Sequence, residues 1–122
     1  MTSFPSAEWF QKYAAFVETD EDVRKHGRWF KASIGFRVDQ HVTTVNFDRG
    51  LILDVVPQYR DADFLISGSA PQWSRLFDDQ WGLVRLYRSQ TLLIRGDAVR
   101  LMKEWKPIFF LVEAMKRLGR SS

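Results

Sequence analysis

The spacing of apolar residues changes from three or four to two near residue 31, and this change most constrains the fold. In KASIGFRV (31–38), apolar side chains alternate with polar ones, as in a strand with one buried face. VTTVNF (42–47), LILDVV (51–56) and ADFLISG (62–68) have strand character and are separated by turn residues. The three closely spaced turns predict an antiparallel meander.

The segments before and after these strands have apolar residues at the spacing of a helix. Residues 6–18 carry an apolar stripe after Ser6, a suitable N-cap, and Thr19 can cap a second short helix that ends at Gly27. We therefore expect an N-terminal helical segment over residues 1–27. Ser69 and Gln72 have the spacing of a capping box, so another helix begins there.

The remaining elements complete an α+β pattern. WGLVRLY (81–87) favours a helix, QTLLIRG (90–96) a fifth strand, and residues 98–118 a last helix with a kink or break near Pro107. The order predicts one domain over residues 1–122, with a five-stranded mostly antiparallel sheet and helices covering one face.

The tripeptide Arg95-Gly96-Asp97 spells a cell-adhesion signal, but its position favours a structural role. Asp97 follows a predicted strand and precedes a helical pattern, so its carboxylate can accept backbone N–H bonds from the first turn. Gly96 allows the backbone to reverse direction. We therefore interpret the tripeptide as a strand end followed by a helix cap.

Composition excludes several classes of site. The chain has no cysteine and two histidines, His26 and His41, so we expect no metal site and no cofactor. The first residues lack a secretory pattern, which together with the absence of cysteine predicts a cytoplasmic protein. Acidic residues interrupt the basic C-terminal region and the aromatics follow core spacing, so we expect no nucleic acid partner.

DADFLISGSAPQWSRLF, followed later by QTLLIRGD and a helix, resembles the lipid-binding domain of type-two sterol carrier proteins. The matching positions are Asp63, Gly68, Ser69, Trp73, Gly96 and Asp97, and the meander from Trp29 to Val56, with Gly50 at its turn, also fits. Two features depart from the family: Arg88-Ser89 stands where a Gly is common, and the N-terminal helical region is long and can cap or fill a cavity.

This resemblance implies that the sheet and helices enclose an apolar cavity that binds a fatty acid, acyl-CoA, sterol or similar lipid. Periodicity alone favours an ordinary solid core, because protein interiors are close-packed. With the resemblance we expect the ligand to contact eight residues. They are Trp73, Phe77, Trp81, Leu92, Ile94, Leu101, Trp105 and Phe109.

Other functions and partners stay open at this point. An enzyme, or an enzyme subunit, could act on a substrate in the same cavity, with Asp63, Tyr87 or Asp97 as acid–base groups. Asp97 as a cap and Arg95 at a solvated strand end are the plainer interpretation, and no catalytic residue is assigned. A transient membrane contact, a homodimer, a larger enzyme partner and an interaction module with exposed aromatics are further alternatives.

Overall fold

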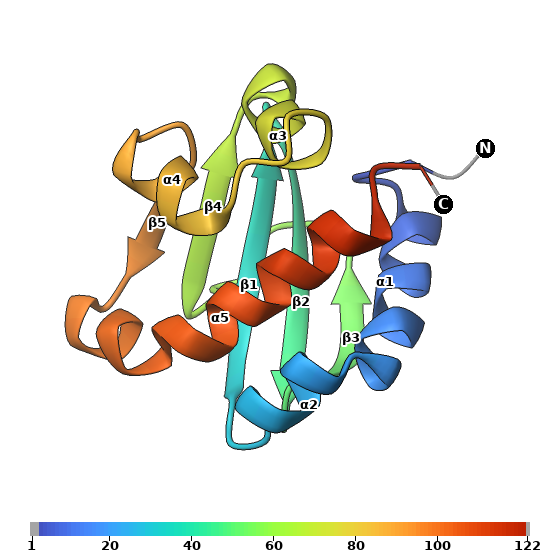
Figure 1. Ribbon diagram of the computed structural model, residues 1–122, viewed down its shortest axis with the longest axis vertical. Helices are drawn as coiled ribbons and strands as arrows, with labels where there is room; N and C mark the ends of the chain where they lie inside the picture. Colours follow the sequence, from blue (N-terminus) through green and yellow to red (C-terminus); the bar gives the residue numbers. More distant parts are fainter. Residues whose placement is uncertain (1–2, 122) are drawn as a thin grey trace.

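The computed structural model describes residues 3–121 and contains one five-stranded sheet with helices on one side of it (Figure 1). Along the chain the elements are α1 (Ala7–Thr19), α2 (Glu21–His26), β1 (Lys31–Val38), β2 (His41–Asp48), β3 (Leu51–Val56), β4 (Phe64–Gly68), α3 (Ala70–Phe77), α4 (Leu83–Arg88), β5 (Leu93–Gly96) and α5 (Ala98–Leu118). The predicted α+β class and mostly antiparallel five-stranded sheet are confirmed.

The strands lie in the order β3-β2-β1-β4-β5. β1–β2, β2–β3 and β4–β5 are antiparallel, whereas β4 is parallel to β1. The prediction that the meander continues into the fourth strand is therefore wrong. Turn signals mark where a strand ends, but they do not tell a hairpin from a crossover to a distant neighbour.

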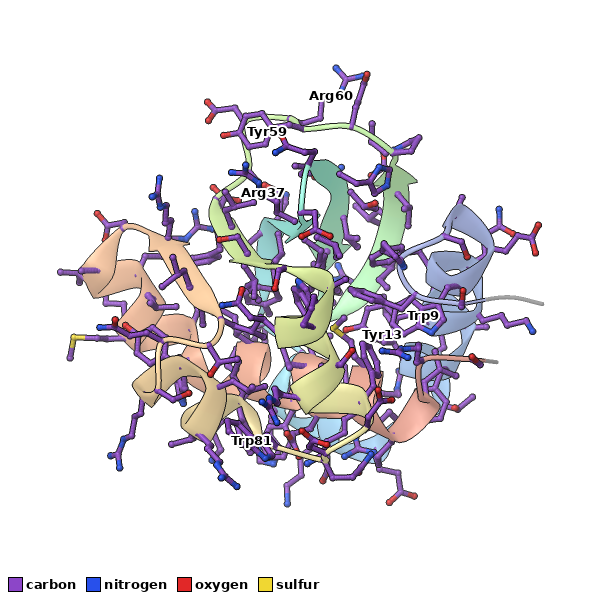
Figure 2. All side chains as sticks on the ribbon, turned by 90° about the horizontal axis from the view of Figure 1, so that it is seen from above. Trp9, Tyr13, Arg37, Tyr59, Arg60 and Trp81 are labelled. Carbon is purple, nitrogen blue, oxygen red and sulfur yellow. The ribbon has the colours of Figure 1, made fainter. Side chains whose placement is uncertain are left out.

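The β3–β4 connection crosses the face of the sheet that the helices leave open. The Thr44 hydroxyl donates to the carbonyl oxygen of Gln58 at 2.9 Å, and the Arg60 backbone N–H donates to the same hydroxyl at 3.1 Å. Tyr59 and Arg60 lie on this side in Figure 2. Buried Thr44 thus holds the crossover against the middle of the sheet.

The core lies between the other face and the helices, where α5 crosses the strands diagonally (Figure 1). The Phe36 ring of β1 lies 5.6 Å from the Phe10 ring of α1 and 6.2 Å from the Trp73 ring of α3. Trp9 and Tyr13 point inward from α1 (Figure 2), and the Tyr13 hydroxyl donates to the Leu111 carbonyl at 2.7 Å. Aromatic side chains therefore join helices and sheet into one core.

Local capping signals are confirmed in most places. Ser69 and Gln72 form the expected capping box, and the Asp97 carboxylate accepts the Arg100 backbone N–H at 2.8 Å. Thr19 is not the cap of α2, because Asp20 accepts the Val23 N–H at 3.1 Å. Asp97 is a helix cap, as its position after the strand predicted.

One predicted boundary is wrong, and a predicted break in the last helix does not occur. The fifth strand begins at Leu93 rather than residue 90, because the backbone N–H groups of Thr91 and Leu92 donate to the Leu86 carbonyl and continue the turn after α4. α5 continues through Pro107 without a break. Burial of Pro107, Ile108 and neighbouring apolar side chains outweighs the one helix hydrogen bond that a proline removes.

Candidate functional site

The eight residues expected to contact a ligand are not gathered in one place. Trp73, Phe77, Leu92 and Leu101 are buried, whereas the other four are partly exposed. Two guanidinium groups lie over the Trp81 ring, with Cζ of Arg85 3.6 Å and Cζ of Arg75 5.2 Å from the ring centre. Phe109 packs edge-on against Phe110 at 5.2 Å. Their assignment to one ligand site stays a prediction.

Trp73 and Phe77 pack in an aromatic cluster with the N-terminal segment. The Phe4 ring lies 5.0 Å from both of their rings and 4.9 Å from the Trp9 ring. A hollow of about 240 Å³ remains beside Phe4, Trp73 and Phe77. Aromatic side chains thus occupy much of the space between the sheet and this part of the helical layer, as expected if the N-terminal region fills part of a cavity.

Leu101 and Trp105 lie instead in an apolar groove between α4 and α5, here named the α4–α5 groove. Its volume is about 500 Å³. The lining residues are Val84, Tyr87, Arg88, Leu101, Met102 and Trp105. The Tyr87 and Trp105 rings, which both line it, contact each other with centres 5.2 Å apart and planes tilted by 55°. Sequence reasoning missed Val84 and Met102, which are apolar side chains outside the apolar stripe expected to face the core.

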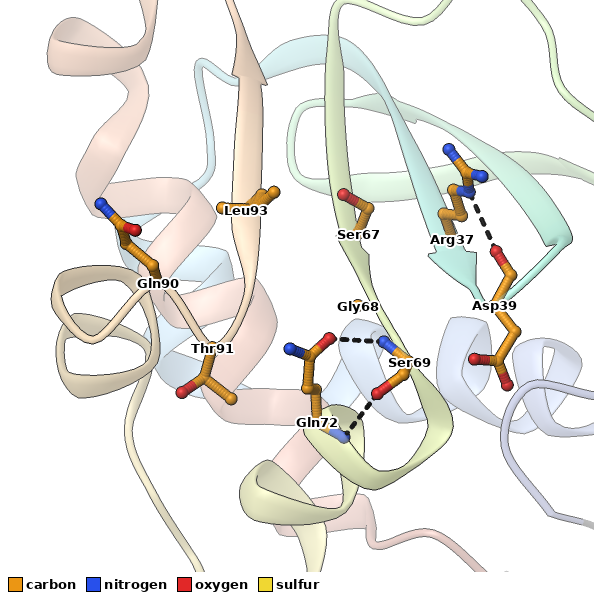
Figure 3. A pocket seen from close by; sticks show the side chains of 9 residues that line it. All are labelled: Arg37, Asp39, Ser67, Gly68, Ser69, Gln72, Gln90, Thr91 and Leu93. Atoms are coloured by element: carbon orange, nitrogen blue, oxygen red, sulfur yellow. Dashed lines mark hydrogen bonds between the residues drawn. The ribbon is translucent and has the colours of Figure 1, made fainter.

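Leu92 and Ile94 line a second groove along β5, the β5 groove, of about 430 Å³. Tyr87 and Arg88 line both grooves, so the two are neighbours. Farther along, Gln90 and Leu93 also line a polar pocket of about 290 Å³ (Figure 3). The surface therefore changes from apolar at α5 to polar at the start of α3.

The polar pocket is built from the ends of β1 and β4. Arg37 Nε donates to the Asp39 carbonyl at 2.9 Å, and the Ser69–Gln72 capping box closes the other side (Figure 3). Both contacts provide hydrogen-bond partners for backbone groups, one just after β1 and the other at the start of α3. The pocket thus offers hydroxyl and amide groups but no cluster of three metal-ligating side chains, and none occurs within residues 3–121.

The acid–base candidates do not converge. Asp63 accepts hydrogen bonds from the Ser33 N–H at 2.8 Å and from the Arg100 guanidinium at 2.7 Å. Burial opposes ionisation of Asp63, but these hydrogen bonds and the charge of Arg100 outweigh it and hold its pKa below the usual value. Asp97 caps α5, whereas Tyr87 lies in the α4–α5 groove. Both carboxylates thus have structural roles.

Comparison with solved structures identifies the architecture. The chain superposes on the crystal structure of sterol carrier protein 2 with a TM-score of 0.79, over 91% of this chain and 95% of that one, at 15% identity. The chain has the sterol carrier protein 2 fold. The apo form of sterol carrier protein 2 from Yarrowia lipolytica matches with a TM-score of 0.61 at 14% identity, over 95% of each chain.

A third sterol carrier structure, palmitated SCP2L2 from Aedes aegypti, matches with a TM-score of 0.59 at 12% identity, over 85% of this chain and 94% of that one. No protein-family model and no curated protein sequence matches the chain. At these identities the likeness shows the fold, and it confirms at that level the resemblance found in the sequence.

Proposed function

We propose that this chain binds and carries a hydrophobic small molecule, such as a fatty acid, acyl-CoA or sterol, in the α4–α5 groove. Three observations support the proposal: the sterol carrier fold, the palmitated state of one structure with that fold, and the apolar lining of the groove. A volume of about 500 Å³ lies in the range of pockets that hold small ligands. The groove lining is the observation that carries the proposal.

Hydrophobic transfer would supply the affinity. Each buried CH₂ contributes about 0.8 kcal/mol, so eight methylenes along Leu101 and Trp105 contribute roughly 6 kcal/mol before the cost of association. Because one methylene changes binding by only about 1–3 kcal/mol, such a groove selects a class of ligand more than a single compound. Arg88 lines both grooves, and we assign its guanidinium the role of orienting a polar head group.

An enzyme acting on the bound molecule is the weaker proposal. Asp63 is engaged by Ser33 and Arg100, and Asp97 by the first turn of α5, so neither carboxylate lines the α4–α5 groove with Tyr87. General acid–base catalysis needs its groups within hydrogen-bond reach of one substrate.

The test is titration of the purified full chain with a fluorescent fatty acid, following quenching of tryptophan emission, with sterol and acyl-CoA probes in parallel. We expect saturable binding, and we expect Met102→Glu to weaken it tenfold or more by placing a charge in the apolar groove. Met102 is 79% exposed, so the substitution should leave folding intact.

Leu53→Glu is the matched control, because Leu53 is also exposed, at 66%, but lies in β3 and lines a different hollow with Asp54 and Asp63. The control should bind like the unchanged chain. Absence of saturable binding for every probe argues against carriage. Loss of binding by Leu53→Glu but not by Met102→Glu would show that the ligand binds in the hollow beside Leu53 and not in the α4–α5 groove.

A further inference from the structure

Positive charge is concentrated in one segment of the chain. Residues 83–106 contain six basic and two acidic side chains, a net charge of +4, whereas the rest contains twelve basic and thirteen acidic ones, a net charge of −1. The whole excess of positive charge therefore comes from α4, β5 and the first half of α5. Five of the six basic residues are exposed: Arg85, Arg88, Arg95, Lys103 and Lys106.

Exposed apolar side chains gather in the same segment. Of the eight large apolar side chains that are exposed among residues 3–121, five belong to it and are between 40% and 79% exposed. They are Val84, Tyr87, Leu93, Val99 and Met102. Scattered surface apolar residues are ordinary, but a cluster of this kind marks an interaction surface.

The two sets occupy one side of the molecule. α4, β5 and the start of α5 lie together at the left in Figure 1. The helical repeat of 3.6 residues places Val99, Met102, Lys103 and Lys106 along one side of α5. Met102 also lines the α4–α5 groove, so this side of the helix borders the groove. We name the five basic and five apolar residues the basic–apolar face.

We propose that the basic–apolar face docks on anionic lipid membranes. Basic side chains are attracted to anionic head groups, and the apolar side chains between them can insert into the hydrocarbon region of the bilayer. Nucleic acid also carries negative charge, but it has no hydrocarbon region into which Val84, Leu93, Val99 and Met102 could insert. The inference does not depend on the proposed function. If both hold, a ligand can pass between the groove and the bilayer without crossing water.

The test uses the purified full chain in a vesicle flotation assay. Vesicles of phosphatidylcholine alone are compared with vesicles containing about one third phosphatidylglycerol. We expect binding to the anionic vesicles, and a large decrease when salt is raised from about 0.1 M to 1 M, because the Debye length then falls from about 10 Å to 3 Å.

Lys103→Gln with Lys106→Gln is the decisive variant, because both residues lie outside the grooves. Each basic residue near an anionic surface raises the affinity about fivefold, so the two substitutions together should weaken vesicle binding on the order of 10- to 30-fold. Lys25→Gln with Arg60→Gln removes the same charge elsewhere, at α2 and at the crossover loop (Figure 2), and should change binding less than twofold.

Equal binding to both kinds of vesicle, equal loss in the two double variants, or tighter binding to a nucleic acid duplex than to anionic vesicles would each overturn the proposal. Ligand titration of the same samples separates the two proposals. Vesicle binding without ligand binding contradicts carriage alone, and ligand binding without vesicle binding contradicts docking alone.

Discussion

Gly96 is a position where one added methyl group should cost the folded chain a measurable part of its stability. It ends β5 opposite Phe64 and has a φ of 154°. A Cβ there would lie 2.8 Å from the backbone oxygen of Asp63 and 2.6 Å from Cδ1 of the fully buried Phe64. Neither neighbour can move freely, because Asp63 is held by Ser33 and Arg100 and Phe64 pairs with β1 and β5.

For Gly96→Ala we therefore add two costs. A residue with a side chain in this backbone region costs about 1–3 kcal/mol, and overpacking costs a further 1–3 kcal/mol, so the free energy of unfolding should fall by roughly 2–6 kcal/mol. At about 4 °C per kcal/mol for a chain of this size, Tm should fall by roughly 8–24 °C. The assay is urea unfolding followed by tryptophan fluorescence, with a thermal scan by circular dichroism.

Gly119→Ala is the matched control. Gly119 also has a positive φ, 90°, but a Cβ there meets no atom within 4 Å. The control therefore carries the backbone cost without the steric one, and the difference between the two variants measures the close approach of β5 to β4. If Gly96→Ala loses no more stability than Gly119→Ala, the reasoning is refuted, since β5 would then have room to shift.

Two further outcomes test the local contacts around the same strand end. Asp97→Ala should cost about 1 kcal/mol in urea unfolding because the Arg100 N–H loses its cap, whereas Asp97→Asn should cost much less; equal losses would contradict the capping role. The pKa of Asp63 is lowered in the folded chain, so its stabilising effect is complete above its ordinary pKa of 3.8 and is lost as the pH falls through the lower, folded value. Urea unfolding between about pH 5 and pH 2 should thus show a steeper loss for the unchanged chain than for Asp63→Asn, and parallel curves would count against the Asp63–Arg100 pair.

Interactions between residues close in the chain could be predicted from the sequence alone. The strand at 31–38 is predicted by its two-residue alternation, and the strand at 51–56 by its β-branched content. Both are typical of a pleated, partly buried strand. The capping box at Ser69 and the cap at Asp97 also follow, because each joins atoms only three residues apart. Thr19 shows the limit, since two adjacent polar residues can both serve as a cap and only the backbone path selects Asp20.

The candidate site was only partly accessible to the same reasoning. Trp73 and Leu101 have the same apolar spacing, yet one joins the aromatic cluster around Phe4 and the other lines the α4–α5 groove. A side chain that fills a core and one that lines a groove satisfy the same requirement for burial, so periodicity does not separate them. Met102 was missed for the opposite reason, because a single exposed apolar residue is ordinary until its neighbours are known.

What the sequence alone determined is therefore the set of elements and most of their ends, through contacts a few residues long. Tertiary structure decided that β4 lies parallel to β1, that Thr44 holds the crossover, and that Trp73 packs against Phe4 whereas Leu101 lines the α4–α5 groove. These features depend on contacts between residues far apart in the chain. Such contacts form only when the whole core packs, and no local pattern of residues encodes which partners meet.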